Sequence, residues 1–121
     1  MRRILVSLAL AVGLSLALAA CAPATVPIAL DESTVVIDVR SSAEFASGHL
    51  EGAINIDVQS PDFDALVQQL DREGAYVVYC RSGNRSGQAI DRMRGLGFTD
   101  LVNAGSVQSA AESTALPVVT G

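Results

Sequence analysis

The sequence predicts an α/β fold in which helices cover both faces of a small parallel sheet. Strand-like runs rich in β-branched residues alternate along the chain with segments of helical periodicity, and glycine or proline separates many of them. The first run, residues 34–39, is nearly all apolar, which is typical of a strand buried on both faces. Because parallel strands are joined by crossovers, usually helices, this alternation favours helices on either side of a central sheet.

The first half of the folded region carries two helix signals and a second strand. Ser41 and Glu44 have the spacing of a capping box, so a short helix should begin there. Residues 53–58 alternate between apolar and polar types and predict a strand. Ser60 and Pro61 suit the N-cap and first position of a second helix. The buried face of that helix should consist of Phe63, Leu66, Val67 and Leu70.

The second half repeats the alternation. Residues 75–79 predict a central strand that ends at Cys80, and Gly74 separates it from the preceding helix. Residues 101–102 predict a short fourth strand, and residues 106–112 a weak last helix. Between them, a helix should run from about Ser86 to the glycines at 95 and 97. Its buried positions should be Ala89, Ile90, Met93 and Leu96.

The N-terminal residues are typical of an export signal. Arg2 and Arg3 precede an uncharged apolar run over residues 4–20, and the chain then reads Leu18-Ala19-Ala20-Cys21. This ending resembles the lipobox of bacterial lipoproteins, which implies cleavage before Cys21 and acylation of its sulfur. A secreted protein without lipid and an uncleaved membrane anchor are the alternatives. We therefore expect a signal peptide over 1–20, a lipidated tether over 21–30 and a folded domain over 31–121, facing the periplasm from the cell envelope.

Charge and cysteine usage narrow the function. Without the signal, six arginines stand against thirteen acidic residues, a net charge of −7, and the chain has no lysine. Nucleic-acid binding is excluded on this ground, since phosphate contacts need a basic surface. If Cys21 carries lipid, Cys80 is the only thiol, so it cannot form an intrachain disulfide. It is either a buried apolar residue or a reactive group.

The residues around Cys80 favour the reactive interpretation. The cysteine lies at the carboxyl end of a predicted central strand, directly before a helix. Open α/β sheets bind their ligands at the carboxyl ends of the strands. Arg81, Arg85 and the first-turn N–H groups of the helix should lower the pKa of the thiol. Gly83 permits the tight turn that aims N–H groups inward, and Ser86 adds a hydroxyl donor.

Four segments together resemble a single-domain rhodanese, a small sulfurtransferase of the exported phage-shock type. They are Asp38-Val39-Arg40, Glu44-Phe45, residues 48–56 (Gly-His-Leu-Glu-Gly-Ala-Ile-Asn-Ile) and residues 80–86 (Cys-Arg-Ser-Gly-Asn-Arg-Ser). The similarity runs from about residue 34 to residue 105. It implies the three-layer rhodanese-like fold and sulfur transfer through a persulfide on Cys80. Thiosulfate or a similar donor would supply the sulfur, and a thiol or cyanide would accept it.

The resemblance also implies the site residues. Cys80 would be catalytic, while Asp38 and His49 would be structural. After the fourth strand this chain departs from the family, because it lacks the paired glycines and the tryptophan of many relatives, which puts the last helix in question. The implied substrate-binding residues are Arg40, Arg81, Ser82, Gly83, Asn84, Arg85 and Ser86.

Two other functions stay open at this point. Cysteine phosphatases and arsenate reductases use a related loop, but there five residues separate cysteine and arginine, and here four separate Cys80 from Arg85. A non-catalytic persulfide carrier or interaction module at the envelope is the other alternative. No cluster of residues has the spacing of a metal site, and we expect no cofactor. The expected partners are a small sulfur donor, a thiol acceptor, the membrane through Cys21 and a periplasmic protein that keeps Cys80 reduced.

Overall fold

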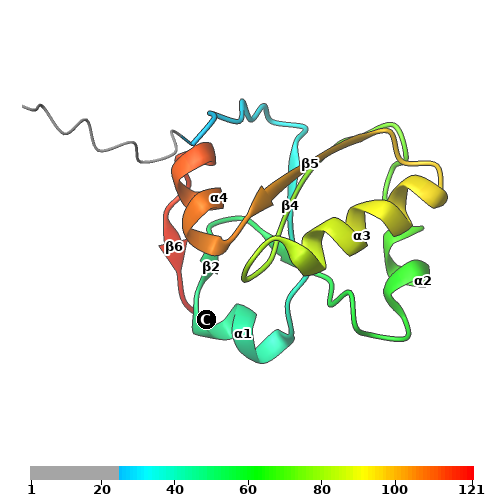
Figure 1. The fold of residues 1–121 in the computed structure, drawn as a ribbon, viewed down its shortest axis with the longest axis horizontal. Helices are drawn as coiled ribbons and strands as arrows, with labels where there is room; N and C mark the ends of the chain where they lie inside the picture. The colour runs from blue at the N-terminus through cyan, green and yellow to red at the C-terminus, as the bar shows by residue number, and fades with distance from the viewer. Residues whose placement is uncertain (1–24) are drawn as a thin grey trace, which may run out of the picture.

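A computed structural model describes residues 25–121 and confirms the α/β class. A four-stranded parallel sheet has the order β3-β1-β4-β5, and a two-stranded antiparallel sheet pairs β2 with β6. Figure 1 shows α2 and α3 on one side of the larger sheet and α4 and β6 on the other. The strands are β1 (Val35–Asp38), β2 (His49–Leu50), β3 (Ile54–Asn55), β4 (Ala75–Tyr79), β5 (Asp100–Gly105) and β6 (Val118–Val119). The helices are α1 (Ser42–Ser47), α2 (Phe63–Val67), α3 (Asn84–Gly95) and α4 (Val107–Thr114).

The two middle strands are covered on both faces, as their apolar composition predicts. β1 pairs with β4 from Val35 opposite Tyr76 to Asp38 opposite Tyr79, so both strands end at the same edge of the sheet. That edge also carries the end of β5, since Tyr79 lies opposite Gly105. Loops that follow these strands therefore meet at one end of the domain.

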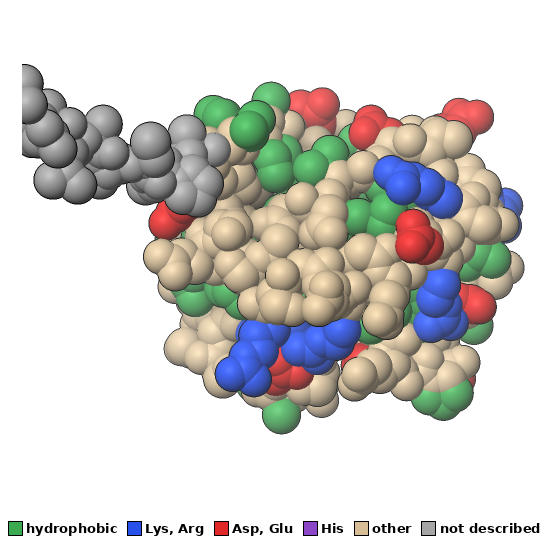
Figure 2. Space-filling model, viewed as in Figure 1, with side chains coloured by type: hydrophobic (Ala, Val, Ile, Leu, Met, Phe, Trp, Pro, Cys, Tyr) green, Lys and Arg blue, Asp and Glu red, His purple; other side chains and the backbone are tan. Residues whose placement is uncertain are grey.

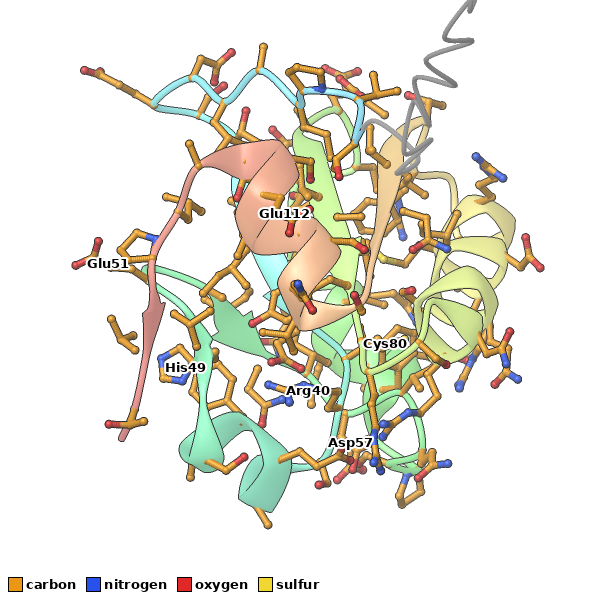
Figure 3. All side chains as sticks on the ribbon, turned by 60° about the vertical axis from the view of Figure 1, so that its left-hand side comes forward. Arg40, His49, Glu51, Asp57, Cys80 and Glu112 are labelled. Atoms are coloured by element: carbon orange, nitrogen blue, oxygen red, sulfur yellow. The ribbon has the colours of Figure 1, made fainter. Side chains whose placement is uncertain are left out.

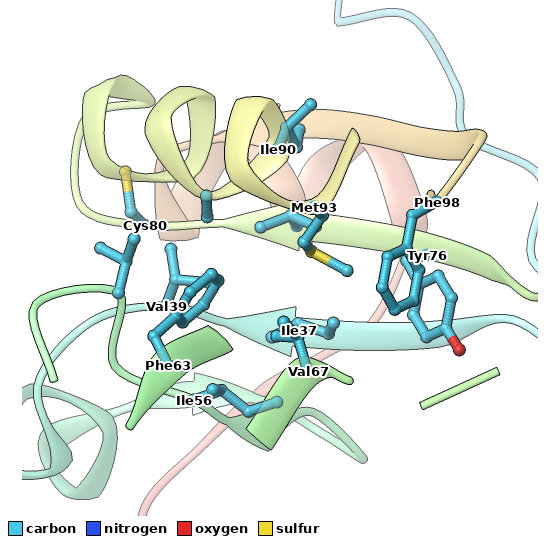
Figure 4. Close-up of a cluster of buried hydrophobic side chains, with 13 residues drawn as sticks. Ile37, Val39, Ile56, Phe63, Val67, Tyr76, Cys80, Ile90, Met93 and Phe98 are labelled. Carbon is cyan, nitrogen blue, oxygen red and sulfur yellow. The ribbon is translucent and has the colours of Figure 1, made fainter. Parts of the chain in front are cut away.

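The α2 and α3 face holds the larger core. Phe63 and Val67 of α2 and Met93 of α3 have no exposed surface, and Figure 4 shows these side chains between the helices and the strands. Tyr76 and Phe98 meet edge to face, with ring centroids 5.6 Å apart. Cys80 belongs to this same cluster, at its end nearest the start of α3.

The α4 face is built from smaller side chains. Ala104 of β5 and Ala110 of α4 are buried against Val77, Tyr79 and Leu50. The α4 helix is two residues longer at its C-terminus than the predicted segment and needs no tryptophan to pack. Its N-cap is Ser106, whose hydroxyl accepts a hydrogen bond from the N–H of Ser109.

The two helices of the first half differ in how well the sequence predicts them. Ser41 caps α1 as expected: its hydroxyl accepts from the N–H of Glu44 at 3.2 Å. The prediction for α2 was wrong at its start. The hydroxyl of Ser60 bonds to the N–H of Asp62, two residues on, and the helix begins only at Phe63. With five residues, α2 turns Phe63 inward and leaves Leu66 42% exposed, contrary to the predicted buried face.

Three further elements differ in length from their predictions. β3 has only two residues, although the N–H groups of Ile56 and Val58 still bond to the end of β1 at Asp38 and Val39. α3 starts at Asn84, two residues earlier than predicted, and β5 extends to Gly105. No sequence pattern predicts β2 and β6, an antiparallel pair that joins the segment after α1 to residues near the C-terminus.

Part of the predicted tether contacts the domain. The N–H of Ile28 donates to the carbonyl oxygen of Ser113 at 2.8 Å, and Leu30 packs against the α4-side core. The predicted boundary at residue 31 stays a prediction. The predicted signal, with Cys21, lies outside the described residues. Within residues 25–121, no helix combines the length and the hydropathy that a membrane crossing needs.

Candidate active site

The turn after β4 carries Cys80 directly into the start of α3. The N–H of Cys80 donates to the carbonyl oxygen of Gly105, which ties this turn to the end of β5. Gly83 has φ of +95°, a backbone conformation that L side chains rarely adopt, and it forms the N-cap of α3. The glycine thus lets the chain turn sharply enough to bring its own N–H back to the cysteine.

Hydrogen-bond donors surround the sulfur of Cys80 on the loop side. The N–H of Gly83 donates to Sγ at 2.9 Å, and Oγ of Ser86 lies 3.4 Å from Sγ. Burial by itself would raise the pKa of the thiol. The Ser86 hydroxyl together with the backbone N–H groups of Ser86, Ser82 and Gly83 outweighs that effect and lowers the pKa below its ordinary value. This arrangement favours a thiolate.

The cysteine is enclosed in this structure. Cys80 has no exposed surface, and it packs within the apolar core beneath α2 and α3. The loop residues above it, Arg81 and Ser82, are exposed. A donor can therefore reach the sulfur only when part of the loop or a bordering side chain moves.

Arg85, predicted to bind substrate, is held by a carboxylate. Its two terminal nitrogens donate to the two oxygens of Glu44 at 2.8 and 2.9 Å, which links α3 to α1. This pairing lowers the pKa of Glu44 to about 2. Glu44, with smaller contributions from Cys80 and Asp57, raises the pKa of Arg85. The Arg85 guanidinium therefore interacts favourably with a Cys80 thiolate while both of its terminal nitrogens are bonded to Glu44.

Arg40 is also held by a carboxylate, and its side chain is more deeply buried than that of Arg85. It is 6% exposed, its Nε and Nη2 bond to the carboxylate of Asp38, and Nη2 also donates to the carbonyl oxygen of Gly48 at 2.6 Å. The guanidinium lies 5.8 Å from the ring centre of Tyr79. Asp38 thus has structural contacts, as the resemblance implies. Arg40 could contact a donor only if this ion pair opened.

The remaining predicted residues lie on the exposed side of the loop. Arg81, Ser82 and Asn84 are exposed, and the side chain of Arg81 makes no hydrogen bond or ion pair to any residue from 25 to 121. In Figure 2 acidic and basic side chains lie side by side along the edge of the molecule near α1. Of the three predicted arginines, Arg81 is therefore the one available to an incoming anion.

Sequence reasoning missed Asn103 and Asp57 at this end of the sheet. Asn103, near the end of β5, accepts from the hydroxyl of Ser86 at 2.7 Å and donates to the carbonyl oxygen of Gly83 at 3.1 Å. Figure 3 shows Asp57 and Arg40 at the same end of the domain as Cys80. Neither Asn103 nor Asp57 stands in a motif that carries chemistry by itself, and only the pairing of β5 with β4 brings Asn103 to the loop.

His49 has structural contacts. Its ring stacks on Phe45, with centroids 3.7 Å apart and an angle of 10° between the planes. Nδ1 lies 2.8 Å from the carbonyl oxygen of Phe45. Across residues 25–121, no three histidine, cysteine or acidic side chains gather in a way that could hold a metal ion.

A parallel sheet that presents a cysteine in a loop of N–H donors before a helix suits nucleophilic chemistry by a thiolate. The chain belongs to the rhodanese-like domain family, whose pattern matches residues 26–109. This match covers β1 to β5 and the start of α4, including every residue of the candidate site.

Named relatives and a solved structure agree with the family. The chain is 33% identical over 85 residues to the thiosulfate sulfurtransferase PspE of Escherichia coli K12, which covers 70% of this chain and 78% of that protein. It is 37% identical over 71 residues to the thiosulfate sulfurtransferase GlpE of Pseudomonas putida, covering 58% and 62%. A structure described as a rhodanese with anions from E. coli has a TM-score of 0.60 at 32% identity, covering 73% of this chain and 99% of that one.

Proposed function

We propose that this protein is a thiosulfate sulfurtransferase that works through a persulfide on Cys80. The observation that carries the proposal is the environment of the sulfur: an N–H at 2.9 Å, a hydroxyl at 3.4 Å and a lowered pKa. A thiolate is the nucleophilic form of cysteine, so this loop prepares Cys80 for attack. Similarity to two named thiosulfate sulfurtransferases supports the choice of reaction.

The transfer has two halves. The thiolate of Cys80 attacks the outer sulfur of thiosulfate, a new S–S bond forms, and sulfite leaves with the electron pair of the old one. The outer sulfur of the persulfide then carries the negative charge, and we expect the loop N–H groups and the exposed Arg81 to stabilise it. In the second half, cyanide or a thiolate attacks that outer sulfur, and Cys80 leaves as a thiolate.

Arg81 and Arg85 have different roles in this proposal. Arg81 is exposed and attracts the sulfonate end of the donor, whereas Arg85 stays paired with Glu44 and contributes its charge to the thiolate. The loop between them must open for the donor, because Cys80 has no exposed surface.

The test is turnover of thiosulfate with cyanide by the purified protein, with Cys80→Ser as the matched inactive variant. Thiocyanate formation by the wild type and none by the variant supports the proposal. The same assay with an aryl phosphate addresses the phosphatase alternative. Phosphate release lost in Cys80→Ser, without thiocyanate formation, would replace the proposal.

The full burial of Cys80 favours one second candidate, a persulfide carrier loaded by a protein donor. A protein partner could open the loop where a small anion does not. A chain that accepts sulfur from a protein persulfide but not from thiosulfate would be a carrier. In either case we propose a lipid anchor on Cys21 that keeps the domain at the periplasmic side of the cell envelope. Mass analysis of the mature N-terminus tests this, and an unmodified Cys21 would contradict it.

A further inference from the structure

The hydroxyl of Ser86 lies among three groups that can accept its proton. Ser86 is fully buried in the first turn of α3, and its Oγ is 2.7 Å from Oδ1 of Asn103, 3.0 Å from the carbonyl oxygen of Gly83 and 3.4 Å from Sγ of Cys80. A hydroxyl has one proton, so these groups compete for it. Where the proton lies therefore depends on the state of the sulfur.

The amide of Asn103 is held in one orientation. Its Oδ1 also accepts from the N–H of Gly105 at 3.0 Å, and its Nδ2 donates to the carbonyl oxygen of Gly83 at 3.1 Å. A flipped amide would set NH₂ against the N–H of Gly105 and lose both bonds. The acceptor end of Asn103 thus faces Ser86 whatever the state of Cys80.

The two states of the sulfur place the Ser86 proton differently. A thiol on Cys80 can donate to Oγ of Ser86, whose own proton then goes to Oδ1 of Asn103. After the thiol loses its proton to water, Sγ is only an acceptor, and rotation about the Cβ–Oγ bond turns the hydroxyl toward it. Oδ1 keeps the N–H of Gly105, so this rotation leaves no buried acceptor unpaired.

We propose that Asn103 is a positioning residue whose Oδ1 accepts the hydrogen bond of the Ser86 hydroxyl when Cys80 is a thiol, and that the hydroxyl turns to Sγ when Cys80 is a thiolate. In a persulfide the negative charge lies on the outer sulfur, so Sγ is a weaker acceptor than Oδ1 and the hydroxyl stays on Asn103. In the second half of the transfer, Cys80 leaves as a thiolate, and the hydroxyl would turn to it at that moment. This part in the transfer rests on the function proposed above. The competition for the proton does not, because it concerns the free cysteine.

Other charges act on Cys80, and substitutions at Ser86 and Asn103 leave all of them in place. Arg85 on α3 is the cation whose pKa is raised by Cys80, and the carboxylates of Glu44 and Asp57 raise the pKa of Arg85 as well. The other charged groups at this end of the sheet are Arg81 in the loop and the Asp38–Arg40 pair at the end of β1. A comparison between variants at Ser86 and Asn103 therefore isolates the hydroxyl and the amide.

The experiment is a double-mutant cycle on the pKa of Cys80 in the reduced protein. The rate of alkylation by iodoacetamide is followed against pH on the peptide that carries Cys80, so that Cys21 does not contribute. Ser86→Ala removes a hydrogen-bond donor to the thiolate, so the pKa of Cys80 should rise. Asn103→Ala removes the nearer of the two acceptors that the Ser86 hydroxyl has in the thiol state, and the pKa of Cys80 should fall. The fall should be at most about one unit, the value of one hydrogen bond, because the carbonyl oxygen of Gly83, 3.0 Å from Oγ, still accepts from the hydroxyl.

The cycle distinguishes competition between Cys80 and Asn103 for the Ser86 hydroxyl from a purely structural role of Asn103 in the loop. In the Ser86→Ala background, Asn103→Ala should leave the pKa unchanged. An equal shift in both backgrounds, or a rise in the Asn103→Ala single variant, would overturn the proposal. Val102→Ala, on the neighbouring and exposed position of β5, controls for changes in the strand. If the pKa shifts follow this pattern but the wild type forms no thiocyanate, the proposed function is refuted and the competition for the Ser86 hydroxyl is not.

A second variant covers the case in which Asn103→Ala does not fold. Asn103→Asp keeps an acceptor toward Ser86 and Gly105 and holds the hydroxyl proton more strongly. It should raise the pKa of Cys80, and part of that rise should disappear in the Ser86→Ala background. A rise that is the same in both backgrounds reflects only the added charge and would overturn the proposal.

Discussion

The ends of β1 and β4 are neighbours, and an arginine follows each of them, but the polar groups there differ in whether they are already paired. After β1, the buried carboxylate of Asp38 and the guanidinium of Arg40 satisfy each other, with the carbonyl oxygen of Gly48 as a further acceptor. After β4, N–H groups converge on the sulfur of Cys80, and Arg81 points to the exposed side. The polar groups after β1 are paired with each other, whereas the N–H groups after β4 can donate to an anion.

This difference shows how to separate structural from functional charge at a strand end. A buried pair whose atoms are all matched stabilises the local chain and offers nothing to a ligand. A loop whose N–H groups surround one ionisable sulfur gains stability when that sulfur, or an anion bound to it, is negative. Substitutions at the end of β1 should therefore change mainly the stability of the domain, and substitutions at the end of β4 mainly the reactivity of Cys80.

Cys80→Ser should have the largest effect. Because no other sulfur lies in the loop, thiocyanate formation should fall by at least about a thousandfold, the scale of covalent catalysis lost with its nucleophile. The melting temperature should change little, since serine keeps the size and the contact with Ser86. Initial rates and thermal unfolding measured on the same preparation check both. Residual activity within tenfold of the wild type would place the nucleophile elsewhere.

Arg40→Ala should mainly destabilise the domain. It leaves the carboxylate of Asp38 buried without its partner, at a cost of about 3–5 kcal/mol in the free energy of unfolding. Denaturant titration measures this, and Arg94→Ala, an exposed arginine on α3, is the control that should cost almost nothing. The KM for thiosulfate of the folded protein should not change. A KM that rises while stability is kept would show that Arg40 binds the donor.

Gly83→Ala should weaken both the fold and the thiolate. The φ of +95° at this position costs an L-residue about 1–2 kcal/mol, although the new Cβ would meet only ordinary contact with Gly105. Gly52→Ala is a matched control, because Gly52 has φ of +81° and open space around it. Both variants should lose similar stability, but only Gly83→Ala should raise the pKa of Cys80. Equal pKa values in the two variants would contradict the role of the loop N–H groups.

Glu44→Gln should have the smallest effect, and it should depend on pH. The folded-state pKa of Glu44, about 2, lies below its ordinary value, so its pairing with Arg85 stabilises the fold above the unfolded-state pKa. For a partly exposed pair, with 21% and 31% of the two side chains accessible, this contribution is about 1 kcal/mol or less. The difference between wild type and variant should therefore be present at pH 7 and shrink as pH falls through the acidic range toward 2. A difference that stays constant with pH would show that another contact is responsible.

The sequence predicted the elements that carry a clear signal within one segment. These signals are the apolar run of β1, the capping box of α1 and the helical spacing of Ala89, Ile90 and Met93 on α3, and the structure confirms all three. The start of α2 could not be predicted in this way, because Ser60 forms a local turn with Asp62 that has the same composition as a cap.

The candidate site shows the same division between local and long-range information. Cys80, Gly83 and Ser86 lie in one short loop, and the sequence was enough to bring them together. The partners of the arginines could not be found from spacing alone, since Glu44 lies 41 positions before Arg85. Asn103 reaches Ser86 only through the pairing of β5 with β4, and the burial of Cys80 depends on how two helices pack on the sheet.

The most direct test of the central claim is the mass of the intact protein after incubation with thiosulfate. If the loop holds Cys80 as a thiolate that accepts sulfur, the mass should increase by one sulfur atom, and cyanide should remove it. Cys80→Ala should show no increase under the same conditions. A wild-type mass that stays unchanged, while the folded protein still reacts with iodoacetamide at Cys80, would contradict the account.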